Sequence, residues 1–126
     1  MAAYLLDTHV LLWWLADPEQ LSAKARTTIA AGSHAIYVSA AAAWEMAIKK
    51  GLGRLEFPGN LPDVLRREHI EVLPISLSHA LAMADLPGHH RDPFDRIQIA
   101  QARLEELTLI TRDPRISQYD VEVLEA

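Results

Sequence analysis

Apolar residues in this chain gather in short continuous runs, which alternate with longer segments where they recur at helical spacing. The short runs are typical of strands that are buried on both faces, and the longer segments are typical of helices. Four of the runs predict strands, and a fifth is a candidate strand. They are Ala3–Leu6, Ala35–Val38, Val72–Ile75, Leu107–Thr111 and, as the candidate, Val121–Leu124.

The polar residues that bound the helical segments have the character of helix caps. Ser39 precedes an alanine-rich segment that ends at Gly51, and Asp92 is followed by Pro93 at the first helical position. The predicted helices are Val10–Leu15, Leu21–Ala31, Ala40–Lys50, Asp63–His69, a segment from Ser76 or Ser78 to Leu86, and Asp92–Glu106.

Strands that alternate with helices along a chain indicate a parallel sheet with helices on both faces. We therefore expect an α/β protein: a three-layer α/β/α sandwich with a central, mainly parallel sheet of four to five strands. A chain of 126 residues can bury one core of this kind but is too short for two, so a single domain over 1–126 is predicted.

Composition and charge limit the metal ligands, the cellular location and the binding partners that we expect. The sequence contains no cysteine, which excludes disulfides and thiolate metal ligands. Its first residues lack the basic stretch of a secretory signal, and no apolar run has the length of a membrane span, so a cytoplasmic protein is expected. The formal net charge of −5 disfavours RNA binding, unless the acids are concentrated where a bound metal offsets them.

Four acidic residues fall where ligands usually bind in a parallel sheet, near the carboxyl ends of its strands. Asp7 directly follows the first predicted strand, and Asp113 follows the fourth. Glu45 lies about two turns into the helix after the second strand, and Asp95 lies in the first turn of the helix that starts at Asp92. We expect these four carboxylates to meet at one edge of the sheet.

Carboxylates that are held close together repel one another, so a cluster of this kind usually holds a cation. Oxygen-only ligands suit Mg²⁺ or Mn²⁺ better than zinc. One or two such ions can activate water and stabilise the oxygens of a phosphodiester displacement. The predicted metal ligands, which are also the predicted catalytic residues, are Asp7, Glu45, Asp95 and Asp113.

Each acid also has a structural explanation when it is considered alone. Asp7 and Asp113 could cap the helices that follow them. A glutamate in the middle of a helix, such as Glu45, is commonly solvated or ion-paired. Asp92 and Asp95 could both favour the start of one helix. The joint position of the four acids at one edge of one sheet favours the metal site.

Four segments of the chain resemble those of the PIN-domain ribonucleases, and in particular the VapC-type toxins of toxin–antitoxin pairs. They are Leu5–His9, Ser39–Glu45, Arg91–Arg96 and Leu107–Asp113, in the family's order and at its spacing. A lone Leu-Leu-Asp-Thr sequence is a weak signal, whereas four segments in register form a strong one. The resemblance implies the family fold, a parallel α/β/α sandwich.

The resemblance also implies an activity and roles for individual residues. The family's four acids fall on the four predicted ligands, and the acid at Asp113 is asparagine in many relatives. Thr111 matches a hydroxyl position that supports the metal site, and Asp92 is interpreted as structural. An endoribonuclease dependent on Mg²⁺ or Mn²⁺ is expected, with RNA as substrate, a cognate antitoxin as partner and a homodimeric assembly.

Basic residues near the acids are candidates for RNA contacts, because cations commonly flank sites where phosphate charge develops. These candidates are Arg96, Arg112, Arg115 and Lys49, and an ordinary solvated side chain is the alternative for each. His89 and His90 are interpreted as part of an exposed polar loop. His9, close to Asp7, is not interpreted as a metal ligand.

Two other functions stay open. A strand-end aspartate such as Asp7 is also the nucleophile of phosphatases and phospho-acceptor domains with a similar sheet. The haloacid-dehalogenase-like phosphatases need a second aspartate two residues later, where this chain has His9. A PIN-like binding module without catalytic activity is the other alternative. Neither a Walker-type loop nor a Gly-x-Gly-x-x-Gly sequence occurs, which disfavours nucleotide binding.

Overall fold

The sheet at the centre of the computed structural model, which describes residues 2–126, is parallel throughout. Its strands are β1 (Ala3–Leu6), β2 (Ala35–Ser39), β3 (Ile70–Leu73), β4 (Thr108–Thr111) and β5 (Val123–Glu125). They lie in the order β3-β2-β1-β4-β5, and each neighbouring pair is parallel. The predicted α/β architecture is confirmed, and the candidate fifth strand is present.

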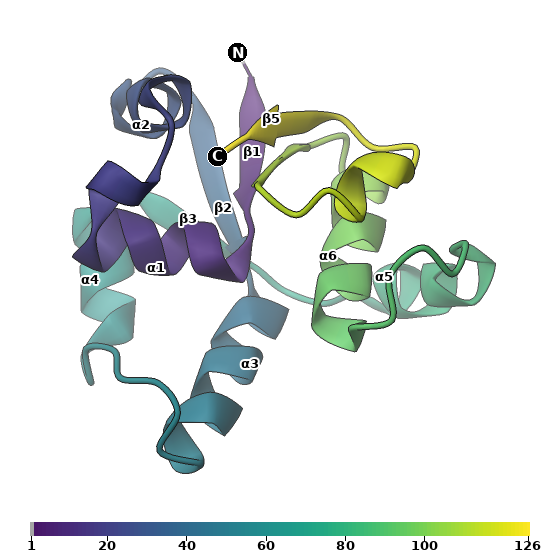
Figure 1. Ribbon diagram of the computed structural model, residues 1–126, viewed down its shortest axis with the longest axis horizontal. Coiled ribbons are helices and arrows are strands. Elements are labelled where there is room, and N and C mark those ends of the chain that lie inside the picture. The colour runs from purple at the N-terminus through teal and green to yellow at the C-terminus, as the bar shows by residue number, and fades with distance from the viewer. Residues whose placement is uncertain (1) are drawn as a thin grey trace.

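The helices cover both faces of this sheet. They are α1 (Thr8–Ala16), α2 (Ala23–Ala30), α3 (Ala40–Gly51), α4 (Leu61–Arg67), α5 (Leu77–Ala82) and α6 (Pro93–Leu104). Figure 1 shows α1, α2 and α4 to one side of the strands and α5 and α6 to the other. Short 3₁₀ turns at Pro18–Gln20, Met83–Asp85 and Ile116–Gln118 complete the connections. No helix within residues 2–126 has both the length and the apolar character that crossing a membrane requires.

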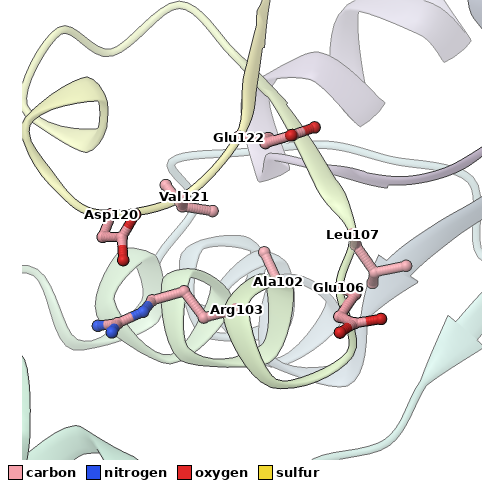
Figure 2. Close-up of a pocket in the computed structure, with 7 residues that line it drawn as sticks. All are labelled: Ala102, Arg103, Glu106, Leu107, Asp120, Val121 and Glu122. Atoms are coloured by element: carbon pink, nitrogen blue, oxygen red, sulfur yellow. The ribbon is translucent and has the colours of Figure 1, made fainter.

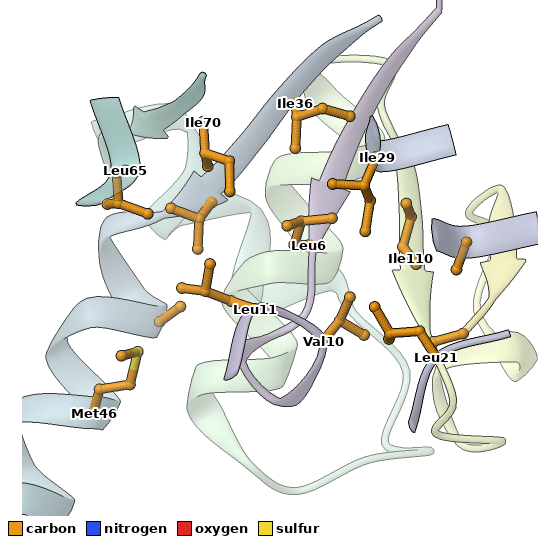
Figure 3. Packing of buried hydrophobic residues seen from close by; sticks show 14 residues of the cluster. Leu6, Val10, Leu11, Leu21, Ile29, Ile36, Met46, Leu65, Ile70 and Ile110 are labelled. Carbon is orange, nitrogen blue, oxygen red and sulfur yellow. The ribbon is translucent and has the colours of Figure 1, made fainter. Parts of the chain in front are cut away.

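Two hydrophobic cores form because successive residues of a strand point to opposite faces of the sheet. Leu6 and Ile110 belong to the core that α1 to α4 cover, whose side chains interlock in Figure 3. Leu5 and Leu109 belong to the core on the other face, together with Ile99 of α6. Since both faces are buried, the central strands are continuously apolar, which explains the short runs in the sequence.

The strand order creates a switch point between β1 and β4. From β1 the chain adds β2 and β3 on one side, and it then returns to add β4 and β5 on the other. Open α/β sheets bind their ligands at the carboxyl ends of the strands that flank such a point. Leu6 pairs with Ile110 in the ladder, so Asp7 and Thr111 come next at the same level of the sheet.

Most elements differ from their predicted bounds by one to four residues, the third strand and the first and fourth helices among them. The third strand is Ile70–Leu73 rather than Val72–Ile75, because Pro74 has no N–H for the ladder. The helix expected to begin at Asp63 begins at Leu61, with proline in its first turn. The first helix begins at Thr8 rather than Val10, which makes Asp7 the residue at the turn between strand and helix.

Candidate metal centre

Asp7 is buried at the junction of β1 and α1. It precedes the first residue of α1, but its carboxylate accepts no capping hydrogen bond from that helix, so the cap interpretation is wrong. Its Oδ2 instead accepts a 2.7 Å hydrogen bond from the hydroxyl of Thr111, the last residue of β4. Burial raises the pKa of Asp7 above its ordinary value, and the Thr111 hydrogen bond offsets part of this effect.

Glu45 is buried on α3, so the solvated alternative is wrong, whereas the ion pair that was the other alternative is present. The small side chains of Ala41 and Ala42, which are fully buried, let α3 pack closely beside the sheet. One oxygen of Glu45, Oε2, accepts a 2.9 Å hydrogen bond from Lys49 one turn later. The other, Oε1, is buried without a hydrogen-bond partner in the described part of the chain. A buried carboxylate oxygen without a hydrogen-bond partner destabilises the folded state unless a cation binds it.

Asp92 and Asp95 have different roles at the start of α6: Asp92 caps the helix, and Asp95 belongs to the acidic cluster. Oδ1 of Asp92 accepts hydrogen bonds from the backbone N–H groups of Phe94, at 2.8 Å, and of Asp95, at 3.3 Å, so the predicted position of Asp92 at the N-cap of the helix is confirmed. Asp95 is thereby free of capping, and its carboxylate joins the cluster. Burial, followed by the charges of Asp7, Asp92, Glu45 and Asp113, raises the pKa of Asp95 from 3.8 to about 7.

Asp113 is bonded more completely than the other acids. Its Oδ1 accepts hydrogen bonds from the backbone N–H and from Nε of Arg115, at 2.9 and 3.0 Å. Its Oδ2 accepts from the Arg115 guanidinium at 2.8 Å and lies 3.0 Å from Nε2 of His90. The hydrogen bonds from Arg115 are the main reason why the pKa of Asp113 falls from 3.8 to about 2. Both oxygens of Asp113 therefore already have cationic or N–H partners.

Two contacts bring α3 and α1 against the first turn of α6. The rings of Trp44 and Phe94 meet edge to face with centroids 5.0 Å apart, next to Glu45 and Asp95 in the sequence. Gln98 is buried, and its Nε2 donates to the hydroxyl of Thr8 at 3.3 Å and to the carbonyl of Phe94 at 3.0 Å. Gln98 is absent from the predicted site residues, because its burial depends on contacts between α6 and α1 that leave no local pattern in the sequence.

His90 is a second buried residue that is absent from the predicted site. It is buried rather than part of an exposed loop, while the neighbouring His89 is exposed as predicted. Its Nε2 lies 2.9 Å from Oδ2 of Asp95 and 3.0 Å from Oδ2 of Asp113. The histidine thus joins two of the predicted ligands. Two adjacent histidines beside an aspartate gave no signal for which one would turn inward.

Three of the four basic candidates line the same pocket as the acids. This pocket, of about 390 Å³, is lined by Asp7, His9, Trp13, Glu45, Lys49, Asp92, Asp95, Arg112, Asp113 and Arg115. Lys49 and Arg115 each pair with an acid of the cluster. Arg112 lies over the ring of Trp13, 4.6 Å from its centroid, and donates to the carbonyl oxygens of Gln20 and Ala126.

Arg96 has a different position from the one expected of an RNA contact. Its guanidinium donates to the hydroxyl of Tyr119 and to four backbone carbonyl oxygens of the preceding loop. These acceptors belong to Met83, Leu86, Pro87 and His90. The structure therefore corrects the interpretation of Arg96: its donors bind this loop instead of a phosphate.

A larger pocket lies at the opposite edge of the sheet and holds none of the four acids. It has a volume of about 540 Å³ and is lined by Ala102, Arg103, Glu106, Leu107, Asp120, Val121 and Glu122, as Figure 2 shows. Leu107 precedes the amino end of β4, whereas Asp113 follows its carboxyl end. Size alone therefore does not identify the candidate site, and the arrangement of carboxylates does.

The residues of the cluster fit a hard divalent cation. Asp7, Glu45 and Asp95 offer oxygen ligands, and Glu45 Oε1 is a buried oxygen with no other partner among residues 2–126. The raised pKa values of Asp7 and Asp95 show that burial and mutual repulsion outweigh the charges available to compensate them. Oxygen ligands and uncompensated negative charge are what Mg²⁺ and Mn²⁺ prefer.

Comparisons with known proteins agree with this fold. The model of the PIN domain family matches residues 4–122. Ribonuclease VapC22 of Mycobacterium tuberculosis is 32% identical over 124 residues, which cover 94% of this chain and 93% of that protein. The fold is similar to that in the crystal structure of VapBC2 from Rickettsia felis bound to a promoter DNA fragment, with a TM-score of 0.74, 16% identity and 98% of each chain covered.

A second solved structure, DNA-bound VapBC from Salmonella typhimurium, has a TM-score of 0.70 at 15% identity and covers 99% of this chain and 98% of that chain. At these identities the structures show the shared fold, while the family match and VapC22 show kinship in sequence. Together, the parallel sheet, the acids at its switch point and these matches establish that the chain belongs to the PIN domain family, among its VapC-type members.

Proposed function

We propose that this protein is an endoribonuclease dependent on Mg²⁺ or Mn²⁺ and that it acts as the toxin of a toxin–antitoxin pair. The observation that carries the proposal is the group of buried carboxylates at the switch point of the sheet, with Oε1 of Glu45 unpartnered within residues 2–126. The name of VapC22 as a ribonuclease supports RNA as the substrate. The solved VapBC complexes support an antitoxin as the partner.

In this proposal Asp7, Glu45 and Asp95 hold the cation. Once bound, the cation would supply an activated water molecule and stabilise negative charge on the phosphodiester. Thr111 fixes one oxygen of Asp7 through its 2.7 Å hydrogen bond, and Lys49 fixes one oxygen of Glu45. These contacts restrict each carboxylate before the substrate arrives, which is how a site avoids reorganisation during the reaction.

Asp113 has a supporting place in the same proposal. Its oxygens are occupied by Arg115 and His90, so it acts on the centre through those two side chains. Lys49, Arg112 and Arg115 line the pocket and are the candidates for contact with RNA phosphates. The net charge of −5 is compatible with this substrate, because three of the acids belong to the proposed cation site.

A homodimer is part of the proposal, as expected from the family. An apolar pocket of about 280 Å³ lies between α3, α5 and α6, and exposed side chains surround it. We define the apolar face as Trp44, Ile75, Leu77, Leu81 and Phe94. Leu77 is 75% exposed and Leu81 is 65% exposed, on a face without charged residues among these five. An exposed apolar face of this kind often marks a protein interface, and a second copy of the chain is its proposed occupant.

The experiment that tests the proposed activity is cleavage of labelled single-stranded RNA by the purified chain in Mg²⁺, in Mn²⁺ and in EDTA. Cleavage is expected with either metal and not with EDTA. Asp7→Asn and Asp95→Asn are expected to lower the rate by at least about 100-fold, because metal ligands matter more than the outer residues that orient them. Asp120→Asn, an exposed acid of the opposite pocket, is the matched control and should keep the parent rate.

If Asp7→Asn and Asp95→Asn cleaved RNA as fast as the parent, the assignment would be wrong. Melting temperatures of the same metal-free variants separate lost chemistry from lost folding. Each substitution removes a buried charge from a repulsive cluster, so the metal-free variants should melt no lower than the parent.

A further inference from the structure

His90 occupies the gap between Asp95 and Asp113. Its Nε2 is within hydrogen-bond distance of one oxygen of each carboxylate, at 2.9 and 3.0 Å. The same three residues could hold a metal ion, as judged by the spacing of their ligand atoms. The role of His90 therefore depends on whether Nε2 carries a lone pair or a proton.

The other ring nitrogen decides this question. Nδ1 of His90 accepts a 3.1 Å hydrogen bond from the backbone N–H of Asp92, so Nδ1 must present its lone pair. A neutral imidazole then carries its proton on Nε2. A histidine that binds a metal usually donates its second ring N–H to an acceptor, which is the reverse of what Nδ1 does here. Nε2 of His90 is therefore a donor, hydrogen-bonded to Oδ2 of Asp113 and in close contact with Oδ2 of Asp95, and not a metal ligand.

The backbone of His90 is held as firmly as its ring. Its N–H donates to the hydroxyl of Tyr119 at 2.9 Å, and its carbonyl accepts from the guanidinium of Arg96 at 3.1 Å. The Tyr119 hydroxyl in turn donates to the carbonyl of Pro87 at 2.7 Å. Because the backbone and Nδ1 of His90 are both hydrogen-bonded, the direction of its Nε2–H bond is fixed. The ring can therefore orient the carboxylates that it contacts.

We propose that His90 is a positioning residue of the metal centre, whose Nε2–H donates to Oδ2 of Asp113 and lies against Oδ2 of Asp95, so that the ring sets the relative position of the two carboxylates. The donor keeps these two like charges from separating, and it leaves Oδ1 as the Asp95 oxygen available to the cation. The inference rests on the proposed function, because it assumes that Asp95 binds a metal. His90 contacts the ligand and not the cation or the substrate.

Two substitutions separate the roles of the ring nitrogens. A glutamine side chain is long enough to place an N–H donor near the position of Nε2, so His90→Gln keeps the contact with the carboxylates. An asparagine side chain ends near the position of Nδ1, so His90→Asn keeps an acceptor for the Asp92 N–H but cannot reach Asp95. Of these two variants, only His90→Gln keeps an N–H donor near the position of Nε2.

The measurement is the dissociation constant for Mn²⁺ alone, by calorimetric titration of each metal-free protein without RNA. His90→Asn is expected to bind Mn²⁺ about 10-fold or more weakly, as is usual when a residue that orients a ligand is lost. His90→Gln is expected to bind close to the parent value. Equal affinity of the two variants, whether high or low, would overturn the proposal, because the Nε2 donor would then not set the affinity.

His79 provides the matched control. It is buried, its Nδ1 accepts a 3.0 Å hydrogen bond from the N–H of Ser76, and its Nε2 lies 2.9 Å from Glu105, outside the pocket of the acids. His79→Asn and His79→Gln should alter the melting temperature and leave Mn²⁺ affinity unchanged. A parent protein that binds no Mn²⁺ would instead refute the proposed metal site, and the inference about His90 with it.

Discussion

Among single residues, Asp95 and Asp113 show how strongly the surroundings change the pKa of two side chains of the same type. Arg115 compensates the charge of Asp113 and lowers its pKa to about 2. Asp95 lies among other acids in a buried site, and its pKa rises to about 7. The first is ionised at any pH near neutrality, whereas the second is half-protonated there when no metal is bound.

The raised pKa of Asp95 predicts how the stability of the metal-free protein depends on pH. Between about 4 and about 7, folded Asp95 holds a proton that the unfolded chain releases, since its ordinary pKa is 3.8. Stability therefore falls as pH rises through this window, because the folded state binds more protons. Asp7 acts in the same direction, and Asp113 acts in the opposite direction only below about pH 4.

Asp95→Asn should remove much of this pH dependence. At pH 8 the metal-free variant is expected to be more stable than the parent by about 2 kcal/mol, since one pKa unit corresponds to about 1.4 kcal/mol and neighbouring acids share the shift. Urea unfolding in EDTA from pH 4 to 8 measures the difference. Parallel stability curves for parent and variant would contradict the assigned environment of Asp95.

Asp7, Glu45 and Asp95 could be predicted from the sequence because strand ends and helix turns fix where those side chains begin. The partners of each carboxylate could not be predicted. His90 reaches the site because a loop turns one of two adjacent histidines inward, and this turn is fixed by nearby Arg96 and by Tyr119, which is 29 residues away. Hydrogen bonds between segments far apart in sequence leave no local pattern.

At the scale of elements, the loop before α6 depends on one side chain of that helix. The Arg96 guanidinium donates to carbonyls of Met83, Leu86, Pro87 and His90 and to the Tyr119 hydroxyl. Carbonyl groups drawn together in this way need a donor that reaches all of them, which the planar fork of arginine supplies. The loop thereby carries His90 to the centre.

Arg96→Gln is expected to lower the free energy of unfolding by about 2–3 kcal/mol, because several partly buried carbonyls lose their donor. Arg103→Gln, an exposed arginine two turns later on the same helix, is the control and should change stability by less than about 0.5 kcal/mol. Chemical unfolding of the two variants gives both values. Similar losses in both would show that the loop does not depend on Arg96.

The sequence predicted the type of nearly every element, and its errors concern boundaries. Continuous apolar runs located the strands because both faces of this sheet are buried. The apolar run predicts a third strand two residues too late, because Ile75 extends the run past Pro74, where the ladder ends and Ser76 begins the cap of α5. A pattern of apolar residues does not take account of the backbone hydrogen bond that a proline removes from the strand.

At the scale of the whole molecule, strand order brings residues from distant positions to one place. Asp7, Glu45, Asp95 and Asp113 come from four different elements or their ends, and the switch between β1 and β4 places them around one pocket. The apolar face on α3, α5 and α6 includes Trp44 and Phe94, the neighbours in sequence of Glu45 and Asp95. The proposed dimer would therefore cover a surface that adjoins the site.

Substitution of the apolar face tests the proposed dimer. The parent is expected to have the molar mass of two chains by light scattering after size-exclusion chromatography. Leu81→Glu should give the mass of one chain, because a buried unpaired carboxylate opposes association. Leu52→Glu, an exposed leucine outside the apolar face, should stay dimeric. A parent that is monomeric alone would contradict the dimer and leave the face to another partner.

The most direct measurement of the central claim is the position of the metal itself. Crystals of the parent soaked in Mn²⁺ and measured for anomalous scattering should show density bounded by the carboxylates of Asp7, Glu45 and Asp95, and crystals of Asp95→Asn should show much weaker density. No anomalous density beside these residues in the parent, or density bonded to Nε2 of His90, would contradict the account.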